Sequence, residues 1–103
     1  MKIQARNRLT MGQRALVSAR LPAAGPGLYS WVWVLPLPGG RFRVAAIDIP
    51  RRLVDGDECF GEEAISTRFL RIVDDIDHVD DAVREAGGDP EELTAPWHNG
   101  FPL

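Results

Sequence analysis

The sequence lacks the features typical of secreted and membrane proteins. It contains a single cysteine, Cys59, which excludes a disulfide within the chain and favours a reducing environment. The longest apolar run, residues 31–35, is much shorter than the roughly 20 residues of a membrane-spanning helix. Residues 1–10 contain no apolar segment typical of a signal peptide. We therefore expect a cytoplasmic protein.

The common catalytic and cofactor-binding motifs are also missing. There is no phosphate-binding loop, no glycine-rich dinucleotide signature, no Gly-x-Ser-x-Gly elbow and no HExxH sequence. The candidate nucleophile is Cys59, with His78 or His98 as its base, but five nearby acidic residues disfavour the thiolate. We therefore predict a protein that is not an enzyme and needs no cofactor.

A metal site is not predicted either. His78 has acidic neighbours at Asp74, Asp75 and Asp81, within about one helical turn on either side. Side chains from one exposed helix face rarely complete a coordination sphere, which needs four or more converging ligands. These residues are better interpreted as a solvated acidic face.

What the sequence does contain is the composition of one small globular domain. Hydrophobic residues make up 45% and charged residues 26% of the 103 positions, which are ordinary values for a folded domain. A chain of this length has room for a single core. We expect one α+β domain over residues 1–103, with an extended C-terminal tail from residue 94.

The charges are divided unevenly along the chain. Residues 1–54 hold nine basic groups and one acid, whereas residues 55–103 hold three basic groups and fourteen acids. Two interpretations are open. The two halves can pack together so that their charges offset each other, or a basic and an acidic patch can persist and recruit oppositely charged partners.

The clearest strand signal lies at residues 28–35. This stretch is rich in aromatic and β-branched residues, and both of its faces are apolar, which predicts a central strand covered on both sides. Residues 36–40 contain two prolines and two glycines and predict a turn. Residues 41–49 return as the partner strand, which Pro50 ends. Residues 51–61 are expected to form a polar connection.

The first 21 residues are harder to interpret. Residues 2–9 alternate between basic or polar and mostly apolar positions, which predicts a strand with one basic face, although Asn7 interrupts the inner face. Residues 10–21 can form either a helix of about three turns or a strand over residues 14–21. Gly12 would be costly inside a helix, so we favour the strand.

Residues 62–87 show a helical period. The apolar residues recur at spacings of four and three, at Ile65, Phe69, Ile72, Ile76, Val79, Val83 and Ala86. This spacing predicts one long amphipathic helix, ended by Gly87 and Gly88, that packs its apolar stripe on the sheet. Ile72 and Ile76 would then be buried. The β-branched residues leave an alternative open, a strand over residues 65–73 followed by a helix from about Asp75.

The C-terminal segment begins with a capping signal. Asp89 is placed to cap a short turn with Pro90 at its first helical position. After residue 93 two further prolines predict an extended tail that carries Trp97 and Phe101. These aromatic residues can either cover the core or serve as an exposed anchor for a partner.

Together these observations predict an α+β fold, in which a small antiparallel sheet of three to four strands packs against the helix of residues 62–87. The predicted function is a small non-catalytic protein-binding module, possibly an inhibitor of the immunity or antitoxin type that presents its acidic helix face to a basic partner such as a toxin or nuclease. The residues predicted to bind the partner are Asp74, Asp77, His78, Asp81, Glu85, Trp97 and Phe101.

The alternative function is nucleic-acid binding by an arginine-rich N-terminal sheet. The basic residues of that surface would be Lys2, Arg6, Arg8, Arg41 and Arg43. Trp31 or Trp33 could add base stacking to phosphate contacts. The net charge of −3 and the acidic helix beside the sheet oppose this interpretation.

Overall fold

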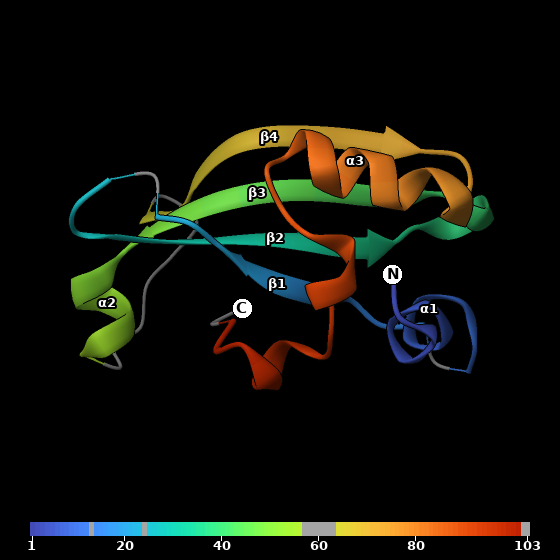
Figure 1. Cartoon of the computed structure of the whole chain (residues 1–103), viewed down its shortest axis with the longest axis horizontal. Helices are drawn as coiled ribbons and strands as arrows, with labels where there is room; N and C mark the ends of the chain where they lie inside the picture. Colours follow the sequence, from blue (N-terminus) through green and yellow to red (C-terminus); the bar gives the residue numbers. More distant parts are fainter. Residues whose placement is uncertain (13, 24, 57–63, 102–103) are drawn as a thin grey trace.

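The computed structural model describes residues 1–12, 14–23, 25–56 and 64–101. Its centre is a four-stranded antiparallel sheet in which the strands follow one another in chain order (Figure 1). The strands are β1 (Val17–Leu21), β2 (Leu28–Pro36), β3 (Phe42–Pro50) and β4 (Ser66–Val73). The α+β class and the predicted antiparallel sheet are therefore confirmed.

The helices are short. The α-helices are α1 (Ile3–Thr10), α2 (Arg51–Asp55) and α3 (Val79–Glu85). The 3-10 turns are η1 (Pro38–Gly40), η3 (Ile76–His78), η4 (Pro90–Glu92) and η5 (Pro96–His98). None of the helices in the described parts of the chain has the length and apolar character of a membrane span. In Figure 1, α3 lies across one face of the sheet, and α1 and α2 lie at opposite ends.

The β2–β3 hairpin forms as predicted. Its register pairs Leu28 with Pro50 at one end and Pro36 with Phe42 at the other. The connection needs two residues with positive φ, and Gly39 and Gly40 supply them at 82° and 77°. Residues 51–55, which we expected to be part of an irregular connection, instead form α2 immediately after β3.

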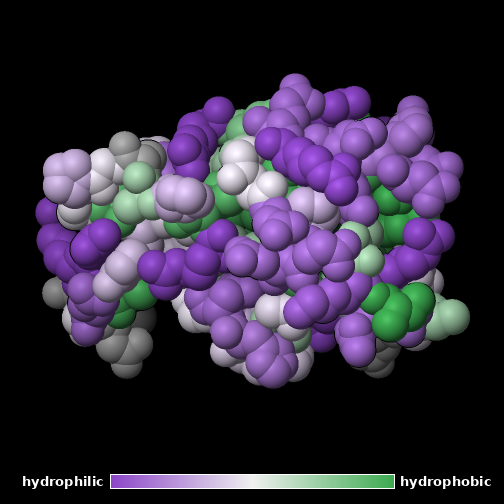
Figure 2. Space-filling view, viewed as in Figure 1, coloured by the Kyte–Doolittle hydropathy of each residue, from purple (hydrophilic) through white to green (hydrophobic). Residues whose placement is uncertain are grey.

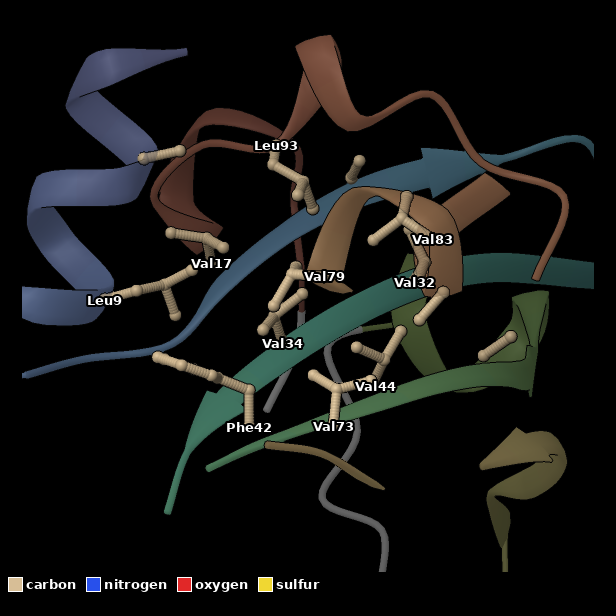
Figure 3. Packing of buried hydrophobic residues seen from close by; sticks show 14 of the residues in the cluster. Leu9, Val17, Val32, Val34, Phe42, Val44, Val73, Val79, Val83 and Leu93 are labelled. Carbon is tan, nitrogen blue, oxygen red and sulfur yellow. The ribbon is translucent and has the colours of Figure 1, made fainter. Parts of the chain in front are cut away.

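One face of the sheet carries the larger apolar cluster. Val32 and Val34 of β2 point into it, and α3 closes it with Val79 and Val83 (Figure 3). Helix α1 adds Leu9, and Leu93 enters from the segment after η4. Burial of this apolar surface, at about 25 cal/mol per Å², supplies most of the driving force for covering this face.

The opposite face carries a second cluster around Trp31. Ile47, Ile49 and Phe101 are buried with it, and Trp31 and Phe101 meet edge to face with 6.1 Å between ring centroids. Both faces of β2 are therefore covered along part of their length, as its composition predicts.

Residues 2–9 do not form the predicted strand; they lie in α1. The residues that α1 buries are Ala5 and Leu9, which are four positions apart and so share one helix face. Ile3, which the strand prediction placed inside, is 61% exposed. The alternation was misleading because only the i, i+4 pair of this segment reaches the core.

The strand interpretation of residues 10–21 is confirmed in its second half. β1 begins at Val17 and buries Val17, Ala19 and Leu21 against the helix-covered face. Gly12 has a φ of 61°, a left-handed conformation that ends any helix continuing from α1.

The single long helix predicted for residues 62–87 is wrong, and the alternative agrees with the structure. Residues 66–73 form strand β4, and a helical segment starts after Asp75, whose side chain accepts a hydrogen bond from the backbone N–H of Asp77 at 3.0 Å. That bond satisfies one free N–H at the start of η3, as an N-cap does in a helix. The β-branched and aromatic residues of 65–73 therefore decided the local structure, and the four-and-three spacing was coincidental.

This correction moves Ile72 out of the core. Phe69 and Val73 of β4 pack against the cluster under α3, whereas Leu70 and Ile72 alternate to the other face and are 60% and 47% exposed. Ile76 is only partly buried beside the same cluster.

The C-terminal segment follows its predicted cap. The Asp89 side chain accepts from the Glu91 N–H at 2.9 Å at the start of η4. Thr94 then forms an antiparallel bridge with Ser18 on β1. The tail expected to be extended contains η5 and returns to the sheet at Phe101.

The burial of two leucines gives a matched test of this fold. Leu93→Ala should lower the free energy of unfolding by about 2–5 kcal/mol, because Leu93 is 1% exposed and its loss leaves a cavity. Leu70→Ala, at a 60% exposed site, should cost less than about 1 kcal/mol, the span of strand propensities. Urea denaturation in dilute solution measures both, and equal losses would contradict the placement of β4.

Candidate functional site

The strongest concentration of charge lies in residues 74–92, which we call the acidic surface. This segment holds nine acids and one arginine, Arg84. The acids are Asp74, Asp75, Asp77, Asp80, Asp81, Glu85, Asp89, Glu91 and Glu92. All except Asp80, which is half-buried, are exposed. In the view of Figure 1 the front face, which α3 and η4 cross, is largely hydrophilic (Figure 2).

Helix α3 fixes the middle of this surface. It buries Val79, Ala82 and Val83 against the sheet, which leaves Asp81 and Glu85 exposed. A helix of seven residues is too short to be stable alone, so these apolar contacts hold its acids in place.

The end of α3 is fixed by two glycines. Gly87 has a φ of 94°, and the N–H of Gly88 donates to the carbonyl of Val83 at 3.0 Å. A Cβ on Gly88 would lie 3.0 Å from a methyl group of Val32 and 3.1 Å from one of Leu21. Gly88 thus lets the chain pass tightly over β1 and β2 on its way to η4.

Three of the predicted partner-binding acids have arginine partners. Asp77 pairs with Arg6 at 3.4 Å, and Glu85 with Arg71 at 2.6 Å. Asp81 pairs with Arg84 at 3.3 Å. Each pair is exposed, so each stabilises the fold by about 1 kcal/mol or less. Of these three pairs, the one between Arg6 and Asp77 joins the two halves of the chain, and the other two lie within the acidic half.

The acids without such a partner lie at the two ends of the segment. Asp74 and Glu92 form no hydrogen bond or ion pair within the described residues. The side chains of Asp75 and Asp89 accept only backbone N–H groups. The acidic surface therefore keeps unneutralised carboxylates at both ends.

The amino group of Met1 joins α1 to this surface. It donates to Asp80 at 2.9 Å and to Glu91 at 2.8 Å. Desolvation lowers the pKa of the amine, but the hydrogen bonds and charges of the two carboxylates together outweigh it and raise the pKa above 8.0. The ammonium ion thus links η4 to the start of α3.

A shallow depression of about 380 Å³ lies beside the acidic surface. Its lining residues are Thr10, Arg14, Gly40, Phe42, Asp74, Asp75 and Ile76. The Arg14 guanidinium donates to the carbonyl of Leu37 at 3.1 Å and lies 5.9 Å from the centre of the Phe42 ring. The depression is therefore lined by two carboxylates and one guanidinium, together with the aromatic ring of Phe42. No local pattern in the sequence predicts it, because its residues come from three separate segments.

The structure separates the two predicted aromatic anchors. Phe101 is buried against Trp31, whereas Trp97 is 69% exposed and is covered on one side by Arg8, at 4.8 Å from its ring centre. Asn99 holds the tail between them, since its carbonyl accepts from the Trp31 indole at 3.1 Å. Phe101 covers the core, and Trp97 remains exposed.

The histidines are placed apart. His78 is exposed at the end of η3, and His98 lies beside the Trp97 ring with a centroid separation of 5.9 Å. Cys59, the candidate nucleophile, lies outside the described residues. Among the residues that are described, no three His, Cys, Asp or Glu side chains gather in a way that could hold a metal ion.

The arginines predicted to form one basic sheet face are dispersed. Arg6 and Arg8 belong to α1 because residues 2–9 are helical. Arg43 is half-buried on β3, and Arg41 is exposed just before that strand. The sheet surface on which the nucleic-acid interpretation depended is therefore not formed as expected.

Comparisons with known proteins add no assignment. No family model matches the chain, and no curated protein or solved structure gives a significant match. The site must therefore be interpreted from the chemistry of its own residues.

The Met1 ammonium predicts a pH dependence of stability. Because its pKa is raised on folding, its contribution is fully present below the unfolded value of 8.0 and is lost as the pH rises through the folded value. The free energy of unfolding should therefore fall as the pH rises above 8.0.

The measurement is a series of urea melts kept below the ordinary tyrosine pKa of about 10. Asp80→Asn combined with Glu91→Gln is the control, because it removes the charged partners and should flatten the dependence. An unchanged slope in that variant would show that the amine is not the titrating group.

Proposed function

We propose that this protein is a non-catalytic protein-binding module that docks its acidic surface on a basic surface of a partner. The observation that supports this is the concentration of nine acids and one arginine in residues 74–92, on elements that pack on one face of the sheet. Rigid placement matters, because charges held in fixed positions give specificity as well as attraction.

The local ion pairs do not oppose such docking. The arginine partners of Asp77, Asp81 and Glu85 are themselves exposed, and exposed pairs are weak. A partner's lysine or arginine can therefore share or replace these contacts at little cost. The unpaired carboxylates of Asp74 and Glu92 are open to a partner from the outset.

The depression beside Asp74 supplies a place for an anchor. A basic side chain of the partner would meet the carboxylates of Asp74 and Asp75 there, while the Arg14 guanidinium, which also lines the depression, is bound to the Leu37 carbonyl. Pockets that enclose one partner side chain often carry much of the binding energy of an interface.

The finer form of the proposal is an inhibitor of the immunity or antitoxin type. The substrate groove of a nuclease is cationic because it binds phosphates. A small protein with a fixed array of carboxylates can occupy such a groove, and long-range attraction speeds its association. We propose a toxin or nuclease as the partner for this reason.

The partner is identified by affinity capture with matched baits. The baits are the unchanged protein, a variant with Asp74→Lys, Asp81→Lys and Glu92→Lys, and the single variant Asp55→Lys. Asp55 is an exposed acid at the end of α2, away from the acidic surface. A specific partner is retained by the first and third baits and lost from the second.

Binding kinetics then test the electrostatic contribution. Reversal of the three acids should slow association by roughly 10- to 1000-fold, with a smaller effect at high salt. Each substitution should change stability by about 0.5 kcal/mol or less, because the three sites are exposed. Asp55→Lys makes the charge change of one of these three substitutions and should leave the association rate within the range of a single distant charge.

Two outcomes would contradict the proposal. A folded triple variant that associates at the unchanged rate would move the interface away from residues 74–92, with exposed Trp97 as the next position to test. Salt-sensitive binding of single-stranded oligonucleotides that disappears with Arg8→Gln and Arg41→Gln would favour nucleic acid as the ligand.

A further inference from the structure

The two edge strands of the sheet differ in how far they are covered by other parts of the chain. β1 forms one edge, and the antiparallel bridge between Ser18 and Thr94 covers part of it. β4 forms the other edge, and among the described residues it pairs only with β3. Eight residues of β4 thus present an edge of backbone N–H and carbonyl groups that can accept another strand.

The side chains of β4 protect this edge only in part. Natural edges are blunted by charged side chains, proline or β-bulges, and β4 has a bulge at Arg68 and a second arginine at Arg71. Beyond the bulge, β4 exposes Leu70 and Ile72, which lie on the same side of the strand because they are two positions apart. Leu70 is the cross-strand partner of Ala45 on β3, which in turn pairs with Trp33 on β2. These three residues form an apolar row across the sheet, and Leu70 lies at its exposed end.

The two arginines of β4 are already neutralised within the chain. Arg68 lies 3.5 Å from the carboxylate of Asp48, and Arg71 lies 2.6 Å from that of Glu85. To bind Arg68, an acidic peptide would have to displace the carboxylate of Asp48, which is buried. A second β4 strand, whose arginines are paired in the same way, needs no such exchange and would meet little repulsion, which makes another copy of the chain the better occupant.

We propose that two copies of this protein pair through β4, antiparallel and with Leu70 opposite Leu70 of the second copy, to form a continuous eight-stranded sheet. The two-fold axis passes between the strands at Leu70, so the same residues are used on both sides. This surface adjoins the acidic surface at the Arg71–Glu85 pair, but the inference does not depend on the proposed function.

The register follows from the side chains. A pairing centred on Arg68 or Arg71 places two arginines directly opposite each other, which is unfavourable. A pairing centred on Phe69 faces Leu70, which is more exposed than Ile72, with Arg68. The pairing centred on Leu70 brings the two leucines together with both Ile72 side chains on the diagonals. It sets each Arg71 opposite a Phe69 ring and each Ile72, the less exposed of the two apolar residues, opposite an Arg68.

The oligomeric state tests the interface with a matched control. Sedimentation from micromolar to millimolar concentration should show a reversible monomer–dimer equilibrium. Leu70→Lys should raise the dimer dissociation constant at least about tenfold. Ile3→Lys makes the same kind of change at a site of matching exposure, 61% against 60%, and should leave the equilibrium unchanged.

Cysteine crosslinking tests the register. In a Cys59→Ser background, Leu70→Cys should form a disulfide-linked dimer on mild oxidation, because directly opposite Cα atoms lie about 4.5–5.5 Å apart, within disulfide range. Ile72→Cys should not, since the two copies of residue 72 would be separated by about 13 Å along the strands. Melting curves of each variant establish that it is folded.

Three results would overturn the proposal. The first is a protein that stays monomeric throughout the concentration range. The second is a dimer that Ile3→Lys disrupts and Leu70→Lys does not. The third is a dimer in which Ile72→Cys crosslinks as fast as Leu70→Cys, because that pattern requires another register or another surface.

Discussion

The structure depends on covering the β2–β3 hairpin on both faces. β2 places Val32 and Val34 on one side and Trp31 and Trp33 on the other, so neither face can be left in water. α3, α1 and Leu93 cover the first face, and the tail with Phe101 covers part of the second. The acidic surface follows from this constraint, because the apolar residues of α3 turn inward and leave its acids outside.

The parts of the fold that could be predicted from sequence are those fixed by nearby residues. The hairpin follows from the composition of residues 28–35 and from Gly39 and Gly40, and the turn at η4 follows from Asp89 and Pro90. The long helix was wrong because its four-and-three spacing fits a strand followed by a helix equally well. Its decisive signals were the β-branched content of residues 65–73 and the capping carboxylate of Asp75.

The site was less predictable because its electrostatics join distant parts of the chain. Arg6 reaches Asp77 across 71 positions, and the Met1 ammonium reaches Asp80 and Glu91 across 79 and 90. Such pairs cannot be predicted from a local sequence pattern, because their members are far apart in the chain. The sequence identified the run of acids, but it left open whether Trp97 and Phe101 cover the core or stay exposed, and it could not place Leu70 and Ile72 on an open edge.

The apolar interior supplies most of the stability of this small chain. The exposed ion pairs of the acidic surface add little stability. We propose that residues 74–92 form the surface that meets a basic partner. Amide hydrogen exchange of the complex with the captured partner tests this proposal most directly. We expect slowed exchange in η3, α3 and η4 on binding, with little change in α2. Slowed exchange confined to α2, or to the tail around Trp97, would contradict it.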